Sequence, residues 1–156
     1  MILADFLPEE EKLARFLASY KTGSIFFLYA SSIHDPKDKY FLVLVAEDTT
    51  TLFIINSKIP TIIRRNPRWE ACQVLIEENF HPDIVEHDCY IDCTFPFSLK
   101  QVIVKTAILG NMKRIKGTLN RETLERVKIA VDKDIRMSFS EKMPILNALR
   151  ATLTSQ

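Results

Sequence analysis

The sequence predicts a single domain that is mainly β with α-helical additions (α+β), built on one small, curved antiparallel sheet. A length of 156 residues suits one domain of ordinary size. Hydrophobic residues make up 47% of the chain and charged residues 26%, which is the balance of a globular protein. Apolar, strand-like runs recur through the middle of the chain, and amphipathic helical patterns flank them.

An N-terminal helix is predicted after Pro8. Proline suits the first turn of a helix, and the three glutamates that follow it favour the positive end of the helix dipole. Apolar residues then recur at the spacing i, i+3, i+4, i+7, namely Leu13, Phe16, Leu17 and Tyr20. This stripe predicts a helix packed on the sheet. Gly23 ends the segment, so residues 1–22 are expected to form an N-terminal helical extension.

Five apolar runs predict strands in one curved antiparallel sheet. Residues 24–29 are almost continuously apolar, which favours a strand covered on both faces. Residues 40–46 and 51–55 are rich in β-branched and aromatic side chains, and the short polar turn between them predicts a hairpin. Residues 72–76 and 90–94 predict the fourth and fifth strands.

A further strand is predicted over residues 99–109, because alternate positions would place apolar side chains on one face. These positions are Val102, Val104, Thr106 and Ile108. With this strand, the predicted β-barrel core spans residues 23–110. A basic hairpin or coil is expected to lead from Gly110 to Gly117.

Two C-terminal helices are predicted within residues 118–153. Asn120 is a favourable N-cap, and Leu119 can pack against Leu124 across it as a hydrophobic staple. The last helix is expected to start at Ser140, with Pro144 in its first turn. Its predicted buried stripe consists of Ile145, Leu149 and Leu153.

Composition argues against several classes of protein. The longest apolar runs are far shorter than the roughly 20 residues that cross a bilayer. The apolar start, residues 1–7, has no basic leader, so a secretory signal is not expected. We therefore expect a soluble, cytoplasmic protein. Three cysteines, an odd number, favour reduced thiols.

The net charge of +1 gives no overall electrostatic field that would attract nucleic acid. Residues 105–128 are basic and residues 77–92 acidic, which suits opposed charged faces or ordinary solvated surfaces.

Five stretches, read in order, match the pattern of one toxin family. They are Gly-Ser-Ile-Phe-Phe at 23–27, Lys-Asp-Lys-Tyr-Phe-Leu-Val-Leu at 37–44, Ile-Ile-Asn-Ser at 54–57, Tyr-Ile-Asp-Cys at 90–93 and Gly-Thr-Leu-Asn-Arg-Glu-Thr-Leu-Glu-Arg-Val at 117–127. Together they resemble the PemK/MazF-like toxins. The resemblance implies an SH3-like barrel, endoribonuclease activity in a toxin–antitoxin pair, an antitoxin-like protein partner and a homodimer.

Two departures from the family pattern matter. The N-terminal helix lies outside the family's minimal barrel. The family's catalytic arginine precedes a proline at the entry to the second strand, where this chain has Lys39 followed by Tyr40. A cation is kept there, but the planar fork that binds phosphate in a bidentate manner is lost.

Metal-independent RNA cleavage needs a base for the 2′-hydroxyl, a cation for the phosphate and an acid for the leaving oxygen. The candidate catalytic residues are Lys39, Ser57, His34 and Asp35, and Lys37 and Lys58 are candidate RNA-binding residues. No cofactor is expected. His-Asp-Pro also has the chemistry of a simple turn, so a purely structural loop is the alternative.

A second candidate RNA-binding group surrounds the chain's tryptophan. Trp69 could stack on a base while Arg64, Arg65 and Arg68 hold phosphates, as in single-strand recognition. Equally, Trp69 could cover the core from a long loop.

The segment from His81 to Cys93 offers an alternative metal site. In an extended strand, His87, Cys89 and Cys93 would point to one face. Their spacing lacks the tighter pairs of usual zinc sites, and the other interpretation places the cysteines in the core.

The function predicted from these observations is a toxin-like RNA-binding protein, a metal-independent endoribonuclease acting on single-stranded RNA. The main alternative is a catalytically inactive SH3-like barrel that serves as a protein- or nucleic-acid-binding regulatory module. Metal-dependent hydrolysis through the His/Cys segment is a third, remote hypothesis.

Overall fold

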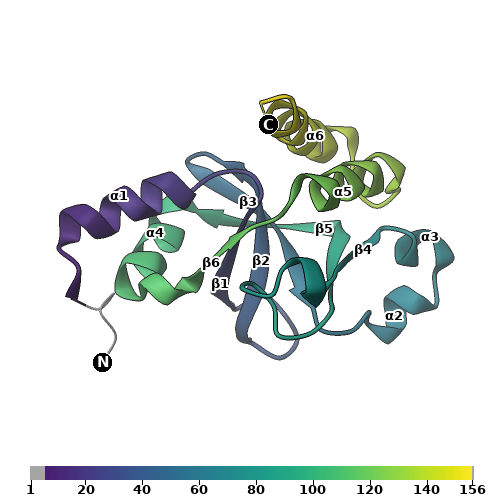
Figure 1. The fold of residues 1–156 in the computed structure, drawn as a ribbon. Helices are drawn as coiled ribbons and strands as arrows, with labels where there is room; N and C mark the ends of the chain where they lie inside the picture. The colour runs from purple at the N-terminus through teal and green to yellow at the C-terminus, as the bar shows by residue number, and fades with distance from the viewer. Residues whose placement is uncertain (1–5, 156) are drawn as a thin grey trace.

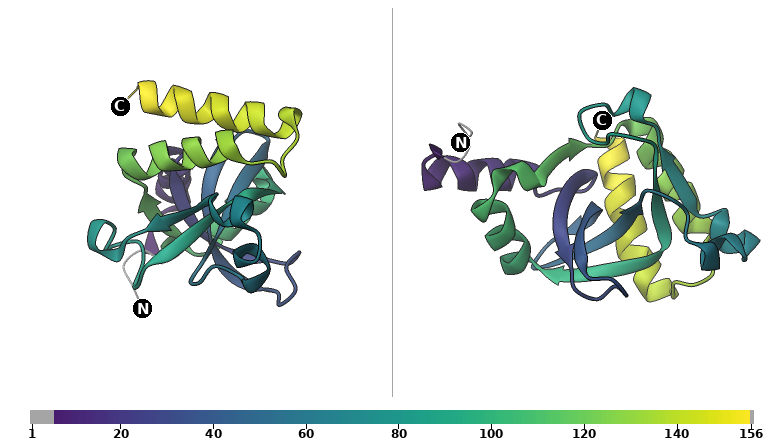
Figure 2. Two further views of the ribbon diagram at one scale, coloured as in Figure 1. Left: turned by 90° about the vertical axis from the view of Figure 1, so that its right-hand side faces the viewer. Right: turned by 90° about the horizontal axis from the view of Figure 1, so that it is seen from below.

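One antiparallel sheet of six strands lies at the centre of the structure, a computed structural model that describes residues 6–155 (Figure 1). The strands are β1 (Ser24–Ala30), β2 (Lys37–Ala46), β3 (Thr49–Asn56), β4 (Gln73–Ile76), β5 (Cys89–Lys100) and β6 (Ile115–Thr118). Their order across the sheet is β4-β5-β3-β2-β1-β6, with every neighbouring pair antiparallel. The sheet curls into a half-barrel (Figure 2), which confirms the predicted α+β class and small curved barrel.

The strands inside the sheet are apolar because both faces are covered. On one face, helices α5 (Arg121–Lys133) and α6 (Phe139–Thr154) stack in two layers above the strands (Figure 2). Ile25, Phe53 and Leu149 belong to the buried cluster on this side. Each large apolar side chain buried in this way contributes about 1.5–3 kcal/mol relative to an exposed one.

The opposite face is covered by helices α1 (Glu9–Ser19) and α4 (Gln101–Gly110). Phe26 of β1 and Phe41 of β2 share a second buried cluster there with Phe16 of α1. Phe16 is fully buried, whereas Leu17 of the same predicted stripe is 60% exposed. Coverage from both sides confirms the expectation drawn from the continuous apolar run of β1.

The prediction of a strand over residues 99–109 is wrong, because α4 begins directly after β5. Its buried residues are Val104 and Ile108, which lie one helical turn apart, while Val102 is 63% exposed. β-branched residues favour strands only weakly, and packing of α4 against α1 decides the outcome. The sheet instead gains β6, in the segment expected to be a hairpin or coil.

The C-terminal helices are capped as their sequences indicate. The Asn120 side chain accepts a hydrogen bond from the Thr123 N–H at 2.8 Å, which confirms the predicted cap of α5. Helix α6 begins at Phe139 rather than at Ser140, because Ser138 and Glu141 form a capping box. Pro144 therefore lies inside α6 and not in its first turn.

Short helices fill the connections between strands. They are α2 (Thr61–Arg64), α3 (Pro67–Glu70) and the 3₁₀ turns η2 (Glu78–Phe80) and η3 (Met112–Arg114). Across residues 6–155, no helix combines the length and the apolarity that crossing a bilayer requires. Residues 1–5, which belong to the segment for which no secretory signal is expected, lie outside the described residues.

Candidate functional site

A hollow of about 200 Å³ lies where the start of β2 meets the end of β3 and the start of β5. Its walls are formed by Phe27, Lys37, Asp38, Lys39, Tyr40, Ile55, Ser57, His87 and Cys89. The sheet register explains why these residues meet, because Tyr40 of β2 pairs with Ile55 of β3, which pairs with Ile91 of β5. Two predicted catalytic residues, Lys39 and Ser57, and the predicted RNA-binding Lys37 thus line one surface.

Lys39 is the half-buried cation of this hollow. Burial lowers the pKa of its ammonium from the ordinary value, and the positive charge of Lys37 lowers this pKa further. An ammonium removed from bulk water interacts more strongly with an anion beside it, because the local dielectric constant is lower. The hollow is therefore electrostatically suited to a phosphate group.

Cations and aromatic rings continue from the hollow toward β6. The rings of Phe27 and Tyr40 lie 4.9 Å apart, and the Lys116 ammonium lies over both, 5.5 and 6.0 Å from their centroids. Arg114 donates to the Phe27 carbonyl at 2.8 Å and pairs with Asp38 at 3.2 Å. The sequence signalled these two cations only through the basic character of residues 105–128.

His87 supplies an acid–base group that the sequence analysis considered only as a metal ligand. Its Nδ1 lies 2.9 Å from the Asp88 carbonyl oxygen and 3.6 Å from the Cys89 sulfur. A carbonyl oxygen can only accept, so Nδ1 carries the proton in the bond to Asp88. Nε2 of a neutral His87 is then the nitrogen that can accept a proton.

Tyr40 and Cys89 hold their protons in this environment. Burial raises the pKa of the Tyr40 phenol, and Glu86 and Cys89 raise it further. Burial and Asp88 raise the pKa of the Cys89 thiol, while Lys39 acts in the opposite direction. A thiol with a raised pKa is a poor nucleophile, so Cys89 serves as wall rather than as reactive group.

The remaining candidate catalytic residues, His34 and Asp35, do not line the hollow. Both are exposed on the loop between β1 and β2, where Asp35 pairs with Lys37 at 3.7 Å. Lys58 is exposed immediately after Ser57. Only part of the predicted catalytic group is therefore brought together.

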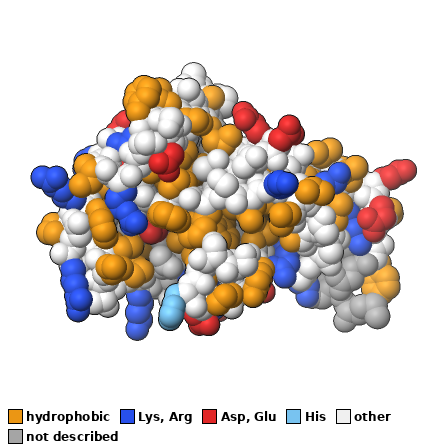
Figure 3. Space-filling model, turned by 180° about the vertical axis from the view of Figure 1, so that it is seen from behind, with side chains coloured by type: hydrophobic (Ala, Val, Ile, Leu, Met, Phe, Trp, Pro, Cys, Tyr) orange, Lys and Arg blue, Asp and Glu red, His pale blue; other side chains and the backbone are white. Residues whose placement is uncertain are grey.

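The predicted arginine–tryptophan group lies on or beside α2 and α3, and none of its residues lines the hollow. Arg64, Arg65 and Arg68 are exposed, and Lys and Arg side chains gather at this end of the molecule, on the left in Figure 3. Trp69 is half-buried, with the guanidinium of Arg136 over its ring.

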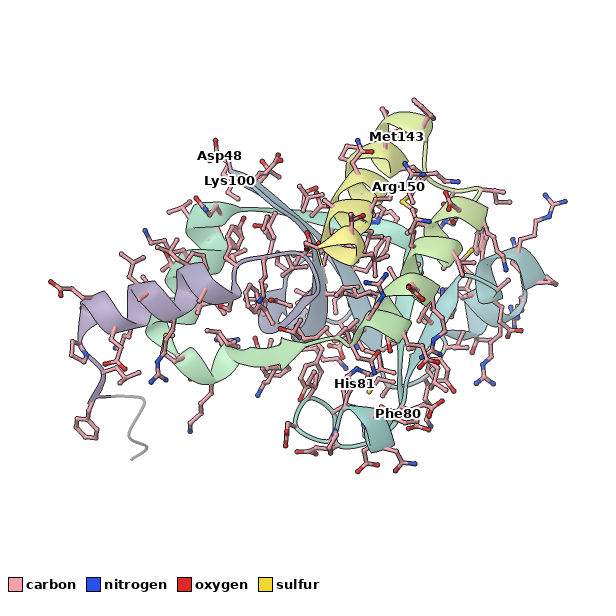
Figure 4. All side chains as sticks on the ribbon, turned by 45° about the horizontal axis from the view of Figure 1, so that its top comes forward. Asp48, Phe80, His81, Lys100, Met143 and Arg150 are labelled. Carbon is pink, nitrogen blue, oxygen red and sulfur yellow. The ribbon has the colours of Figure 1, made fainter. Side chains whose placement is uncertain are left out.

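The alternative metal site does not form. Cys89 and Cys93 are buried in the core, and His87 is exposed. His81 lies beside Phe80 below the start of α5 (Figure 4), and its Nε2 accepts the Asn120 N–H at 3.2 Å. Within the part of the chain that the structure describes, no group of three or more His, Cys, Asp or Glu residues is arranged to hold a metal ion.

Compared with known protein families and with curated proteins, the chain matches none of them. The resemblance to PemK/MazF-like toxins thus stays a prediction.

Proposed function

We propose that the hollow binds the phosphate backbone of single-stranded RNA and that the protein is a toxin-like, metal-independent endoribonuclease. The observation that carries this proposal is the meeting of Lys39, Ser57 and His87 in one hollow. The half-buried cation and the imidazole are two of the groups that RNA cleavage without a metal requires, and the Ser57 hydroxyl can donate a hydrogen bond to the phosphate.

The roles follow from the chemistry of each group. Nε2 of His87 removes the proton of a ribose 2′-hydroxyl, and the 2′-oxygen attacks phosphorus as the bond to the 5′-oxygen breaks. Lys39 stabilises the negative charge that develops on the phosphate. The Tyr40 phenol, which also lines the hollow, supplies the proton of the leaving oxygen.

The surroundings of the hollow suit a nucleic-acid strand. Lys37 adds positive charge to the wall of the hollow, and Lys116 adds a cation over the Phe27–Tyr40 ring pair. Bases stack on aromatic side chains while cations follow the phosphates, which is the general mode of single-strand binding.

A second candidate function is a binding module without catalysis, in the cytoplasm and paired with a regulatory protein. It is favoured by the surplus of cations and rings over acid–base groups, because His87 is the one imidazole among the residues that line the hollow. An antitoxin-like partner and a homodimer belong to the first proposal.

Incubation of the purified protein with labelled single-stranded RNA in EDTA tests the proposal. We expect cleavage that survives EDTA and falls on the order of 100-fold in Lys39→Ala, since one preorganised charge contributes roughly that factor. Lys39→Arg should retain cleavage, because a guanidinium binds phosphate well.

Lys100→Ala is the matched control. Lys100 is an exposed lysine beside Asp48, at the opposite end of the β3–β5 pair from Ser57 (Figure 4). Wild-type cleavage by Lys39→Ala would show that the site is wrong. RNA binding without any cleavage by the wild type would favour the binding module.

A further inference from the structure

Strand β4 is an open edge of the sheet. It pairs with β5 on one side and, within residues 6–155, with no strand on the other; Figure 1 shows it at the margin of the sheet beneath α5. The Cys93 N–H donates to the Cys72 carbonyl, next to the paired residues Gln73 and Asp92. Since hydrogen-bonded pairs alternate along an antiparallel ladder, the backbone groups of Gln73 and Leu75 point to the open edge.

A groove of about 300 Å³ runs between this edge and α5. It is lined by Ala71, Gln73, Val74, Leu75, Arg126, Ile129, Ala130 and Lys133. The lining is apolar except for one amide and two cations, and it contains no acidic residue. Ile129 is 51% exposed there, which leaves apolar surface in contact with water.

Two buried polar atoms in the groove wall have no hydrogen-bond partner among the described residues. The Gln73 side-chain nitrogen donates to the Asp92 carboxylate at 2.9 Å and to the Trp69 carbonyl at 3.4 Å, which leaves Oε1 without a donor. Nε of Arg126 has no acceptor, although its Nη2 donates to Thr123. Buried polar groups without partners cost free energy, but both atoms have almost no exposed surface, so a ligand in the groove does not reach them directly and the positive charge of the lining decides which ligand is favoured.

We propose that the β4 edge and the β4–α5 groove bind an extended, acidic peptide segment of a partner protein by strand addition. The peptide backbone pairs with Gln73 and Leu75, apolar side chains lie against Ile129, and carboxylates pair with Arg126 and Lys133. A second copy of this chain is disfavoured, because edge-to-edge pairing would bring the cations of two grooves together. The site is separate from the hollow and does not depend on RNA cleavage.

The probe is a fluorescent peptide of alternating glutamate and valine, and the measurements are fluorescence anisotropy and amide hydrogen exchange on the full chain. We expect saturable binding and increased protection of the Gln73 and Leu75 amides. Lys133→Glu should weaken binding about tenfold, as reversal of a charge at an interface does, and should confer binding of the matching lysine–valine peptide.

Lys128→Glu is the matched control. It makes the same charge change on α5 but faces a different hollow, lined by Arg121 and Arg150, so binding should change far less. Three results would each overturn the proposal: equal binding of the lysine and glutamate peptides by the wild type, protection confined to residues outside β4, or self-association that Lys133→Glu alters.

Discussion

The guanidinium of Arg136 lies 4.3 Å from the centre of the Trp69 ring and also faces Phe95 at 5.7 Å. Its Nη1 donates to the Thr94 hydroxyl at 3.3 Å, which fixes the side chain in this position. A base could stack on this side of Trp69 only by displacing a cation that the chain itself provides. The tryptophan is therefore better suited to holding the segment between α5 and α6 in place than to binding RNA.

Removal of this cation should be visible in tryptophan fluorescence. Trp69 is the chain's single tryptophan, so the emission reports the surroundings of this one ring. Arg136→Ala should shift emission to longer wavelength, increase quenching by iodide and cost about 0.5–1 kcal/mol of stability. Arg68→Ala, an exposed arginine in the same helix as Trp69, should leave emission unchanged. Identical spectra for Arg136→Ala and the wild type would contradict the stacking.

Lys39 should destabilise the fold while it serves the site. Its pKa in the folded state is lowered from 10.5, chiefly by burial, so the unfolded state binds more protons between the lowered value and 10.5. The free energy of unfolding therefore rises with pH across that window. Below the window, the cost of burying the charge is present in full. Lys39→Met should modestly raise the free energy of unfolding at neutral pH. It should also remove the contribution of Lys39 to the increase of this free energy with pH.

Urea denaturation of wild type and Lys39→Met at a series of pH values measures this effect. Lys100→Met is the control, because Lys100 is exposed. A Lys39→Met protein that is less stable than the wild type at neutral pH would show that burial of the Lys39 ammonium does not destabilise the fold.

The cap of α5 should contribute measurably to stability. Asn120→Ala removes the bond to the Thr123 N–H and should cost about 1 kcal/mol in urea denaturation. Asn147→Ala, at an exposed position within α6, should have little effect or stabilise slightly, since alanine favours helices. An unchanged midpoint for Asn120→Ala would count against the cap.

Two glycines should respond oppositely to alanine. Gly117 has a φ of +146°, and a Cβ there would meet Ile84 Cγ1 at 2.9 Å. Gly117→Ala should therefore cost about 1–3 kcal/mol. A Cβ on Gly110 would meet nothing within 4 Å, so Gly110→Ala should preserve or raise stability. Thermal unfolding of both variants provides the comparison, and equal melting temperatures would refute it.

The sequence predicted the fold best where local patterns suffice. The strands from β1 to β3 are continuous β-prone runs with short connections, and α5 has both a cap and a staple. Residues 101–110 misled the prediction because Val102 and Ile103 are β-prone yet exposed on a helix. Strand β6 is not predicted from the sequence, because a strand of four residues that includes a glycine has too short an apolar pattern to be recognised.

The candidate site can be predicted only in part from the sequence, for a related reason. Lys39 and Ser57 lie near the ends of adjacent strands, so their proximity follows from a hairpin. His87 reaches the hollow through the pairing of β3 with β5, which the sequence does not specify because α2, α3, β4 and η2 lie between these two strands. The position of Lys116 depends on the pairing of β6, which the sequence does not predict. His34 is as good a candidate as Lys39 in the sequence, because a loop has no strand register that would place its side chain.

The strand order also determines when each strand can pair during synthesis of the chain. Strand β1 is made early, yet its second neighbour, β6, ends at Thr118, and helices α5 and α6, which cover one face of the sheet, follow later still. A nascent chain that ends before β6 leaves β1 with one open edge, and one that ends before α6 leaves Ile25 and Phe53 without their full cover. During translation the β1 edge is therefore exposed to non-native strand pairing until β6 leaves the ribosome.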